Sequence, residues 1–198
     1  MNLLELAPDD ALAALATWFA ARGHARYRAG QVLARLWQRP VDGFADMTEL
    51  PKPLRDELDA SFTMPRLELT TRQASTDGTQ KFLFRLHDGQ LIETVSIPDD
   101  DRVTLCISSQ AGCALQCAFC ATGAMGFQRN LSPSEIAGQV RELRMLTPPL
   151  LATNIVFMGM GEPMMNWKAV AATLSLLNDP RAIGIGARHI TISTVGVL

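Results

Sequence analysis

Strand-like and helix-like segments alternate along the second half of the chain, and this order restricts the possible folds more than any other feature. The strand candidates are short and apolar, and the helix candidates repeat their apolar residues at helical spacing. The segments are strands at 103–108, 154–158 and 189–194, with helices at 132–145 and 167–177 between them. Strands joined by crossover helices lie parallel in one sheet, so we predict an α/β fold.

The first half of the chain divides into a helical part and a strand-rich part. Helical spacing occurs at 9–22, 30–38 and 51–62, and Asp9 or Asp10 is the expected cap of the first helix. Short β-prone segments follow, separated by the turn signals Asp77-Gly78 and Asp88-Gly89.

The polar run at 99–101 is a plausible boundary between the strand-rich part and the α/β part. We therefore predict a helical accessory domain at 1–64, a β-hairpin region at 65–99 and an α/β region at 100–198. No helix follows the last predicted strand, which would leave an apolar sheet edge open. We expect the sequence to be part of a longer protein.

Three cysteines crowd one loop directly after the first α/β strand. Cys113, Cys117 and Cys120 have the spacing C-x3-C-x2-C. Three thiolates on one loop can bind three irons of a [4Fe–4S] cubane and leave the fourth iron open to a cofactor. The alternatives are a zinc site, for which Cys106 would supply the fourth ligand, or thiols without a shared role.

A glycine-rich segment ends the second α/β strand. Gly159 and Gly161 allow the backbone to approach a ligand closely, and their backbone groups together with Glu162 can bind an ammonium group. Ser193 ends the third strand at the same edge of the predicted sheet, where barrel enzymes keep their sites. Without further context, a tight turn explains the two glycines and Ser193 equally well.

The sequence around these motifs resembles the RlmN/Cfr family of radical SAM RNA adenine methyltransferases. The resemblance is closest in the segments 106–113, 119–131 and 159–166, which read CISSQAGC, FCATGAMGFQRNL and GMGEPMMN. It includes YRAGQ at 27–31 and TDGTQK at 76–81, so it covers most of the chain. It implies a partial, truncated radical SAM (β/α) barrel preceded by the helical domain and the hairpin region. The implied cofactors are a [4Fe–4S] cluster and S-adenosylmethionine.

The family's residue roles can be carried over to the matching positions of this sequence. The resemblance assigns the cluster ligands to Cys113, Cys117 and Cys120. It assigns S-adenosylmethionine contacts to Gly161, Glu162 and Ser193. It assigns the catalytic acid/base to Glu93 and a second reactive thiol to Cys106.

The residues alone leave these last two roles open. Cys106 shares a strand face with Thr104 and Ser108, so its thiol either points toward the site or is a buried, inert cysteine. Glu93 is either a charge at a sheet edge or a partly buried base.

The resemblance also implies a reaction, which is methylation of C2 of adenosine in 23S rRNA and tRNA. In the family, a cysteine near the C-terminus carries the methyl group, and the residue matched by Cys106 helps to release the product, leaving a disulfide. No cysteine follows Cys120 in this sequence, so we expect this chain alone to be inactive in methyl transfer. An electron donor such as flavodoxin or ferredoxin is an implied partner. The alternatives are a Cfr-type adenine-C8 methyltransferase and, in another class, a zinc-stabilised RNA-binding module.

Composition and charge limit the partners and the location that we expect for this chain. With a net charge of −2 and 47% hydrophobic residues, the chain is globular and has no global electrostatic attraction to nucleic acid. A local basic cluster in the helical region either contacts phosphates or is a solvated surface; it comprises Arg22, His24, Arg26, Arg28, Arg35 and Arg39. No segment approaches ~18 apolar residues and the N-terminus lacks signal features, so we expect a cytoplasmic protein without a membrane span.

Overall fold

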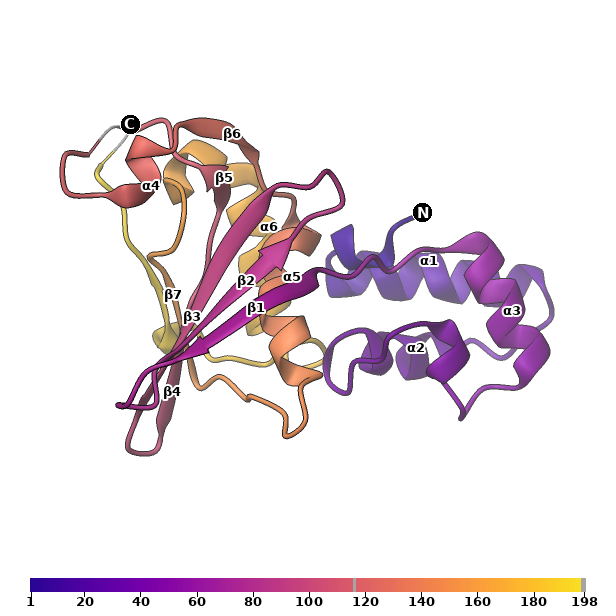
Figure 1. The fold of residues 1–198 in the computed structure, drawn as a ribbon. Coiled ribbons are helices and arrows are strands. Elements are labelled where there is room, and N and C mark those ends of the chain that lie inside the picture. Colours follow the sequence, from indigo (N-terminus) through magenta and orange to yellow (C-terminus); the bar gives the residue numbers. More distant parts are fainter. Residues whose placement is uncertain (116, 197–198) are drawn as a thin grey trace.

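The computed structural model describes residues 1–115 and 117–196, and it arranges them in two packed units (Figure 1). Residues 1–64 form a helical unit. The following residues form a larger unit built around a mixed sheet, which we call the sheet unit. The α/β fold predicted from the alternation of segments is confirmed.

The helical unit contains three α-helices, α1 (Pro8–Ala21), α2 (Arg28–Trp37) and α3 (Lys52–Ser61). Their inward faces bury large side chains, among them Leu15, Phe19 and Trp37, which are all fully inaccessible. The expected aspartate cap of α1 is wrong, because the helix begins at Pro8 and the cap position is Ala7. Proline suits the first helical position because the N–H that it lacks would have no partner inside the helix.

The main sheet of the sheet unit has six strands in the order β1-β2-β3-β4-β7-β8. The bounds are β1 (Glu68–Ala74), β2 (Gln80–Arg85), β3 (Leu91–Asp99), β4 (Arg102–Cys106), β7 (Asn154–Phe157) and β8 (Ile190–Ile192). β1 to β4 pair antiparallel, whereas β4, β7 and β8 pair parallel. The polar residues 99–101 therefore turn the chain between two neighbouring strands of one sheet.

The parallel strands are joined by the expected crossover helices, α5 (Pro133–Arg144) and α6 (Trp167–Asn178). Between β4 and α5 the chain forms a small two-stranded sheet and a short helix. These elements are β5 (Gln110–Gly112), α4 (Ala121–Ala124) and β6 (Phe127–Asn130).

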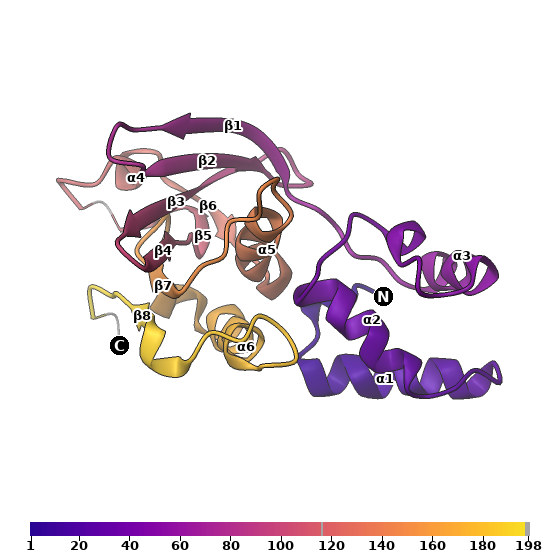
Figure 2. The same ribbon diagram turned by 90° about the horizontal axis from the view of Figure 1, so that it is seen from below.

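The two faces of the main sheet have different environments. Figure 2 shows the strands stacked in order from β1 to β8, with α5 and α6 on one side. On the helix-covered face, Phe82, Ile92, Leu105 and Ile155 are fully buried. The opposite face carries the alternate side chains and stays partly accessible. This open face is where a site can form.

Helix α5 is buried almost throughout because it lies between the sheet and the helical unit. Its start is a capping box: Ser132 Oγ accepts from the Glu135 N–H at 3.3 Å, and Glu135 Oε2 accepts from the Ser132 N–H at 2.9 Å. Every residue from Ser134 to Leu143 is buried.

Two arginines of α5 connect it to the helical unit. Arg141 is inaccessible to solvent, and its guanidinium donates to the carbonyls of Leu36, at 2.9 Å, and of Val41. Arg144 donates to the Trp37 carbonyl at 3.1 Å. Leu36 and Trp37 lie at the end of α2, where carbonyl groups lack partners within the helix. Burial lowers the pKa of Arg141 to about 10 and the charge of the nearby Glu142 opposes this shift, so the guanidinium stays charged at neutral pH.

We predict that Arg141→Met destabilises the chain by about 3 kcal/mol, because buried carbonyls lose a charged donor. Urea unfolding followed by circular dichroism measures this difference. The matched control is Arg39→Met on the exposed surface of the helical unit, which we expect to change the unfolding free energy by less than about 0.5 kcal/mol. Equal effects of the two substitutions would show that the Arg141 contacts do not hold the units together.

Candidate functional site

The cysteine loop leaves the sheet at the carboxyl end of β4 and is closed at its base by the β5–β6 pair. The Cys113 N–H donates to the Gly126 carbonyl at 3.1 Å, and within the loop the Cys120 N–H donates to the Cys117 carbonyl at 3.0 Å. Cys117 and Cys120 line a cavity of about 300 Å³ together with Ala118, Gly123 and Ala124. The base is therefore fixed, and two of the cysteines line a common space.

All four cysteines are free thiols. Over residues 1–115 and 117–196, no group of three or more His, Cys, Asp or Glu side chains is already gathered as a metal site. Cys113 is buried, and its sulfur accepts from the Leu115 N–H at 3.4 Å. The donor set still fits a [4Fe–4S] cluster, because three unpaired thiols occupy one short loop whose ends are anchored.

The glycine-rich segment after β7 packs tightly against the chain that leads into the cysteine loop. A Cβ atom on Gly159 would lie 2.7 Å from the carbonyl carbon of Ile107, and one on Gly161 would lie 2.5 Å from Cβ of Gln110. Gly161 also has a φ of +101°, which side-chain-bearing residues rarely adopt. The glycines are thus required for contact between two segments of the protein, a reason that the sequence did not reveal.

Glu162 follows these glycines and is buried. Its Oε1 accepts from the Met164 N–H at 3.0 Å and its Oε2 from the Val195 N–H at 3.1 Å. Burial disfavours the charged carboxylate, but hydrogen bonds from Thr194 and the two backbone N–H groups outweigh it and lower the pKa of Glu162. Glu162 therefore ties the glycine-rich segment to the residues that follow β8.

Ser193 lies in that same stretch, one residue beyond β8, and is exposed. Because Glu162 binds the backbone of Val195, the structure brings Gly161, Glu162 and the Ser193 region to one end of the parallel strands. The three expected S-adenosylmethionine contacts are thus neighbours in the fold.

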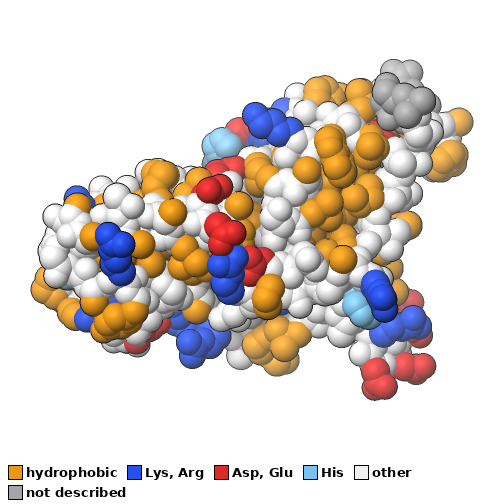
Figure 3. Space-filling view, turned by 180° about the vertical axis from the view of Figure 1, so that it is seen from behind, with side chains coloured by type: hydrophobic (Ala, Val, Ile, Leu, Met, Phe, Trp, Pro, Cys, Tyr) orange, Lys and Arg blue, Asp and Glu red, His pale blue; other side chains and the backbone are white. Residues whose placement is uncertain are grey.

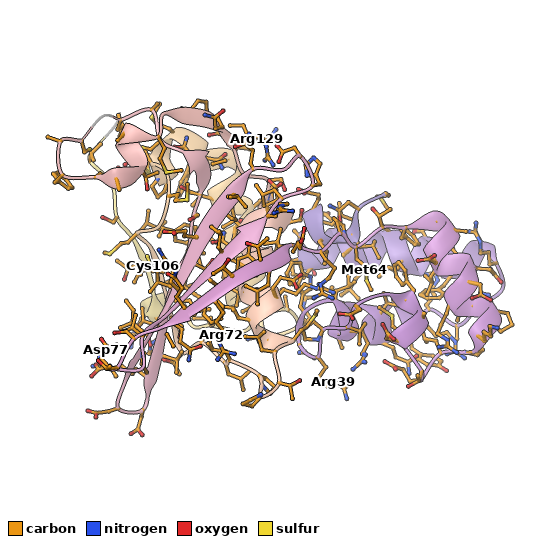
Figure 4. All side chains as sticks on the ribbon, in the orientation of Figure 1. Arg39, Met64, Arg72, Asp77, Cys106 and Arg129 are labelled. Carbon is orange, nitrogen blue, oxygen red and sulfur yellow. The ribbon has the colours of Figure 1, made fainter. Side chains whose placement is uncertain are left out.

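Glu93 and Cys106 share the open face of the sheet. Val95 on β3 pairs directly with Cys106 on β4, and Glu93 lies two residues from Val95, so all three side chains project to the same side. Lys81 on β2 reaches Glu93 on this face, with its Nζ 2.9 Å from Oε1. Cys106 lies in the sheet, far from Met64 and Arg39 in the helical unit (Figure 4).

Cys106 is half-buried, and burial raises the pKa of its thiol, an effect that a hydrogen bond with the Met158 backbone partly offsets. The thiol is therefore protonated at neutral pH. A protonated thiol can donate a proton or a hydrogen atom, but it is a poor nucleophile.

Arg129 is a positioning residue for the loop that sequence reasoning missed. Its guanidinium binds both carboxylate oxygens of Glu135, at 2.7 and 2.8 Å, and also contacts Asp88 at the β2–β3 turn. The hydrogen bond from Arg129 lowers the pKa of Asp88 to about 2. The sequence indicated Arg129 only through its position in the segment 119–131 of the family resemblance. Its partners Asp88 and Glu135 lie far apart in the chain, so no local pattern predicted the contact.

The basic cluster expected in the helical unit is partly neutralised. Arg22 and His24 both lie 3.8 Å from Glu57, and Arg35 lies 3.4 Å from Glu49. Seen from behind, basic side chains are scattered among acidic ones, and hydrophobic side chains gather over the sheet unit (Figure 3).

Among the described residues, no helix is long and apolar enough to cross a membrane.

Comparisons with known proteins agree with this geometry. A family model for the radical SAM superfamily matches residues 107–198, and one for the ribosomal RNA large subunit methyltransferase N-terminal domain matches residues 1–64. The chain is 77% identical over 197 residues to a probable dual-specificity RNA methyltransferase RlmN from Gemmatimonas aurantiaca, covering all of this chain and 55% of the relative. It is 46% identical to the dual-specificity RNA methyltransferase RlmN of Geotalea uraniireducens, covering 93% of this chain and 53% of the relative.

A solved structure shares the fold. The crystal structure of a radical SAM methyltransferase from Sphaerobacter thermophilus aligns with a TM-score of 0.87 and 41% identity, covering all of this chain and 57% of that one. The architecture is therefore that of a radical SAM protein. More narrowly, the chain belongs to the RlmN family, which confirms the resemblance drawn from the motifs. The chain spans about half the length of the curated relatives that it matches.

We predict that Gly161→Ala destabilises the chain by at least about 2 kcal/mol, because the methyl group meets Gln110 and the backbone is held at positive φ. Gly30→Ala is the matched control, since its added Cβ meets no atom within 4 Å in α2 and alanine favours a helix by up to about 1 kcal/mol. Thermal unfolding of both variants measures the difference. A Gly161 variant as stable as the parent would contradict the close packing of the two segments.

The raised pKa of Cys106 gives a second prediction. In a variant with Cys113, Cys117 and Cys120 changed to Ser, Cys106 is the remaining thiol. Because only the thiolate reacts, its alkylation rate by iodoacetamide should rise with pH through a midpoint above that of an unstructured cysteine peptide. The peptide, and the same variant unfolded in urea, are the controls. A folded-state midpoint at or below the peptide value would contradict the burial of the thiol.

Proposed function

We propose that this chain forms the cluster- and S-adenosylmethionine-binding part of a radical SAM methyltransferase that modifies C2 of adenosine in RNA. The observation that carries the proposal is the convergence of three elements on one end and one face of the sheet. These are the anchored cysteine loop, the glycine-rich segment tied to the end of β8, and the face that presents Glu93 and Cys106.

The cofactor roles follow from the chemistry of the side chains. Cys113, Cys117 and Cys120 would hold a [4Fe–4S] cluster through their thiolates. Gly161 and Glu162, with Ser193, would bind the methionine part of S-adenosylmethionine, whose ammonium suits the ionised carboxylate. When bound, the two cofactors supply a radical that can take a hydrogen atom from an unreactive carbon.

Glu93 and Cys106 would handle protons at the substrate. The Glu93 carboxylate accepts or returns a proton at its oxygens, and Lys81 holds one of those oxygens by their ion pair. Cys106 enters the reaction protonated because burial disfavours its thiolate. Its place on the same face as Glu93 allows both groups to act on one base.

The substrate would be an adenine in RNA. The family resemblance implies two RNA classes, 23S rRNA and tRNA, and the relatives named dual-specificity RNA methyltransferases are consistent with two classes. Because C2 of a stacked adenine is out of reach of a side chain, the target base must be flipped or lie in a loop. We place the reaction in the cytoplasm, with a flavodoxin or ferredoxin as electron donor. Methylation at C8 is the alternative, which the position of the methyl group in the product would reveal.

Methyl transfer itself would need a further cysteine to carry the methyl group. The four cysteines of this chain are Cys106 and the three proposed cluster ligands. We therefore expect this chain to bind the cofactors without completing methylation.

The test is anaerobic reconstitution of the chain with iron and sulfide, followed by EPR of the reduced protein with and without S-adenosylmethionine. We predict about four irons per chain and a cubane signal that the cofactor shifts. Cys113→Ala should lose the cluster, whereas the control Cys106→Ser should keep it because Cys106 is not a ligand.

Two results would oppose the proposal. One is stoichiometric zinc in folded protein that forms no cluster, which would favour a zinc-stabilised module. The other is a cluster that depends on Cys106 as strongly as on Cys113.

A further inference from the structure

The glycine-rich segment is held by side chains of the strand exit that lies next to it. The Met160 N–H donates to Ser108 Oγ at 2.9 Å, and the Glu162 N–H donates to Gln110 Oε1 at 2.9 Å. In return, the N–H groups of Ser109 and Gln110 both donate to the Met160 carbonyl, at 2.8 and 3.1 Å. Ser108 and Gln110 are almost completely inaccessible to solvent. Two side chains thus satisfy backbone donors on both sides of Gly161.

Ser108 has a second partner on another strand. Its hydroxyl donates to the Glu93 carbonyl at 2.6 Å while it accepts from Met160. A single hydroxyl therefore connects β3, which carries Glu93, to the segment that carries Gly161 and Glu162. The Ser108 hydroxyl thus directly links a residue proposed for proton handling to the segment proposed for cofactor binding.

Helix α5 fixes Ser108 in place through Gln139. The Gln139 side chain accepts from the Ser108 N–H and donates to the Ser108 carbonyl, both at 2.8 Å. Its oxygen also accepts from Thr94 Oγ1 at 2.8 Å, on the residue after Glu93. Gln139, Thr94 and Ser108 are all fully buried, so no water competes for these bonds.

Such a network matters because the segment that it holds is intrinsically flexible. Gly159 and Gly161 lose more conformational freedom on ordering than other residues do. If the segment were free, a ligand would have to order it on binding and would bind more weakly. We propose that Ser108 and Gln110 are positioning residues that preorganise the 159–162 segment for S-adenosylmethionine, and that Ser108 sets its position relative to Glu93. This inference rests on the proposed function.

The neighbouring residue provides a matched comparison. Ser109 is as buried as Ser108, but its hydroxyl has no hydrogen-bond partner among the described residues. Replacing Ser109 by alanine removes the same atom from the adjacent position without removing a side-chain bond to the 159–162 segment. Any general effect of losing a buried hydroxyl here should appear in both serine variants.

The experiment measures S-adenosylmethionine affinity by equilibrium dialysis on the reconstituted 198-residue chain, with iron content and urea unfolding determined in parallel. We expect Ser108→Ala to weaken binding about tenfold, the effect of losing one buried hydrogen bond, with unchanged iron content. In the apo chain, the Met160 amide should exchange its hydrogen at least about tenfold faster. Ser109→Ala should match the parent in S-adenosylmethionine affinity, iron content, urea unfolding and amide exchange.

A second substitution keeps the test decisive if Ser108→Ala does not fold. Gln110→Met has a similar size and removes the acceptor of the Glu162 N–H, so it should weaken binding to a similar extent and speed exchange at Glu162. Ser108→Thr retains a hydroxyl and should restore binding. The inference is overturned if folded Ser108→Ala or Gln110→Met binds S-adenosylmethionine like the parent, or if Ser109→Ala weakens binding equally. If the parent chain itself binds no S-adenosylmethionine, the proposed function fails. If the parent binds it and the folded variants bind it equally well, only the present inference fails.

Discussion

The structure depends on the burial of one helix, α5, on all its sides. The sheet covers one side of the helix and the helical unit covers another, so polar groups on α5 must find partners within the protein. Arg141 and Arg144 find them in carbonyls at the end of α2, and Gln139 finds them in the backbone at Ser108. The same helix therefore holds the two units together and fixes the position of Ser108 next to the candidate site.

This arrangement connects distant parts of the molecule through direct contacts. Gln139 lies two residues from Arg141, so the contacts to the site and the contacts to the helical unit leave opposite sides of the same turn of one rigid helix. On the other side of the site, Arg129 joins the strand after the cysteine loop to the start of α5. The cysteine loop, the glycine-rich segment and Glu93 all have partners on α5 or one contact away from it.

Much of the fold could be predicted from the sequence because it depends on local patterns. Short apolar segments predicted the parallel strands, and helical spacing predicted the crossover helices between them. The site's contacts could not be predicted in this way. Gln139 reads as an ordinary helical glutamine, although its place on the apolar face between Ile136 and Leu143 was a signal of burial. Gly161 reads as a ligand-binding glycine because its neighbour Gln110 comes from a distant part of the chain.

The pairing of β3 with β4 has a consequence for the strand that carries Cys106. Without β1 to β3, β4 would be an edge strand and would present unpaired N–H and C=O groups to other molecules. The antiparallel hairpins move the free edge outward to β1, whose side chains are mostly polar and exposed. The accessory strands thus shield the strand that carries Cys106 from edge-to-edge aggregation, and a version trimmed to begin at β4 would lose that protection.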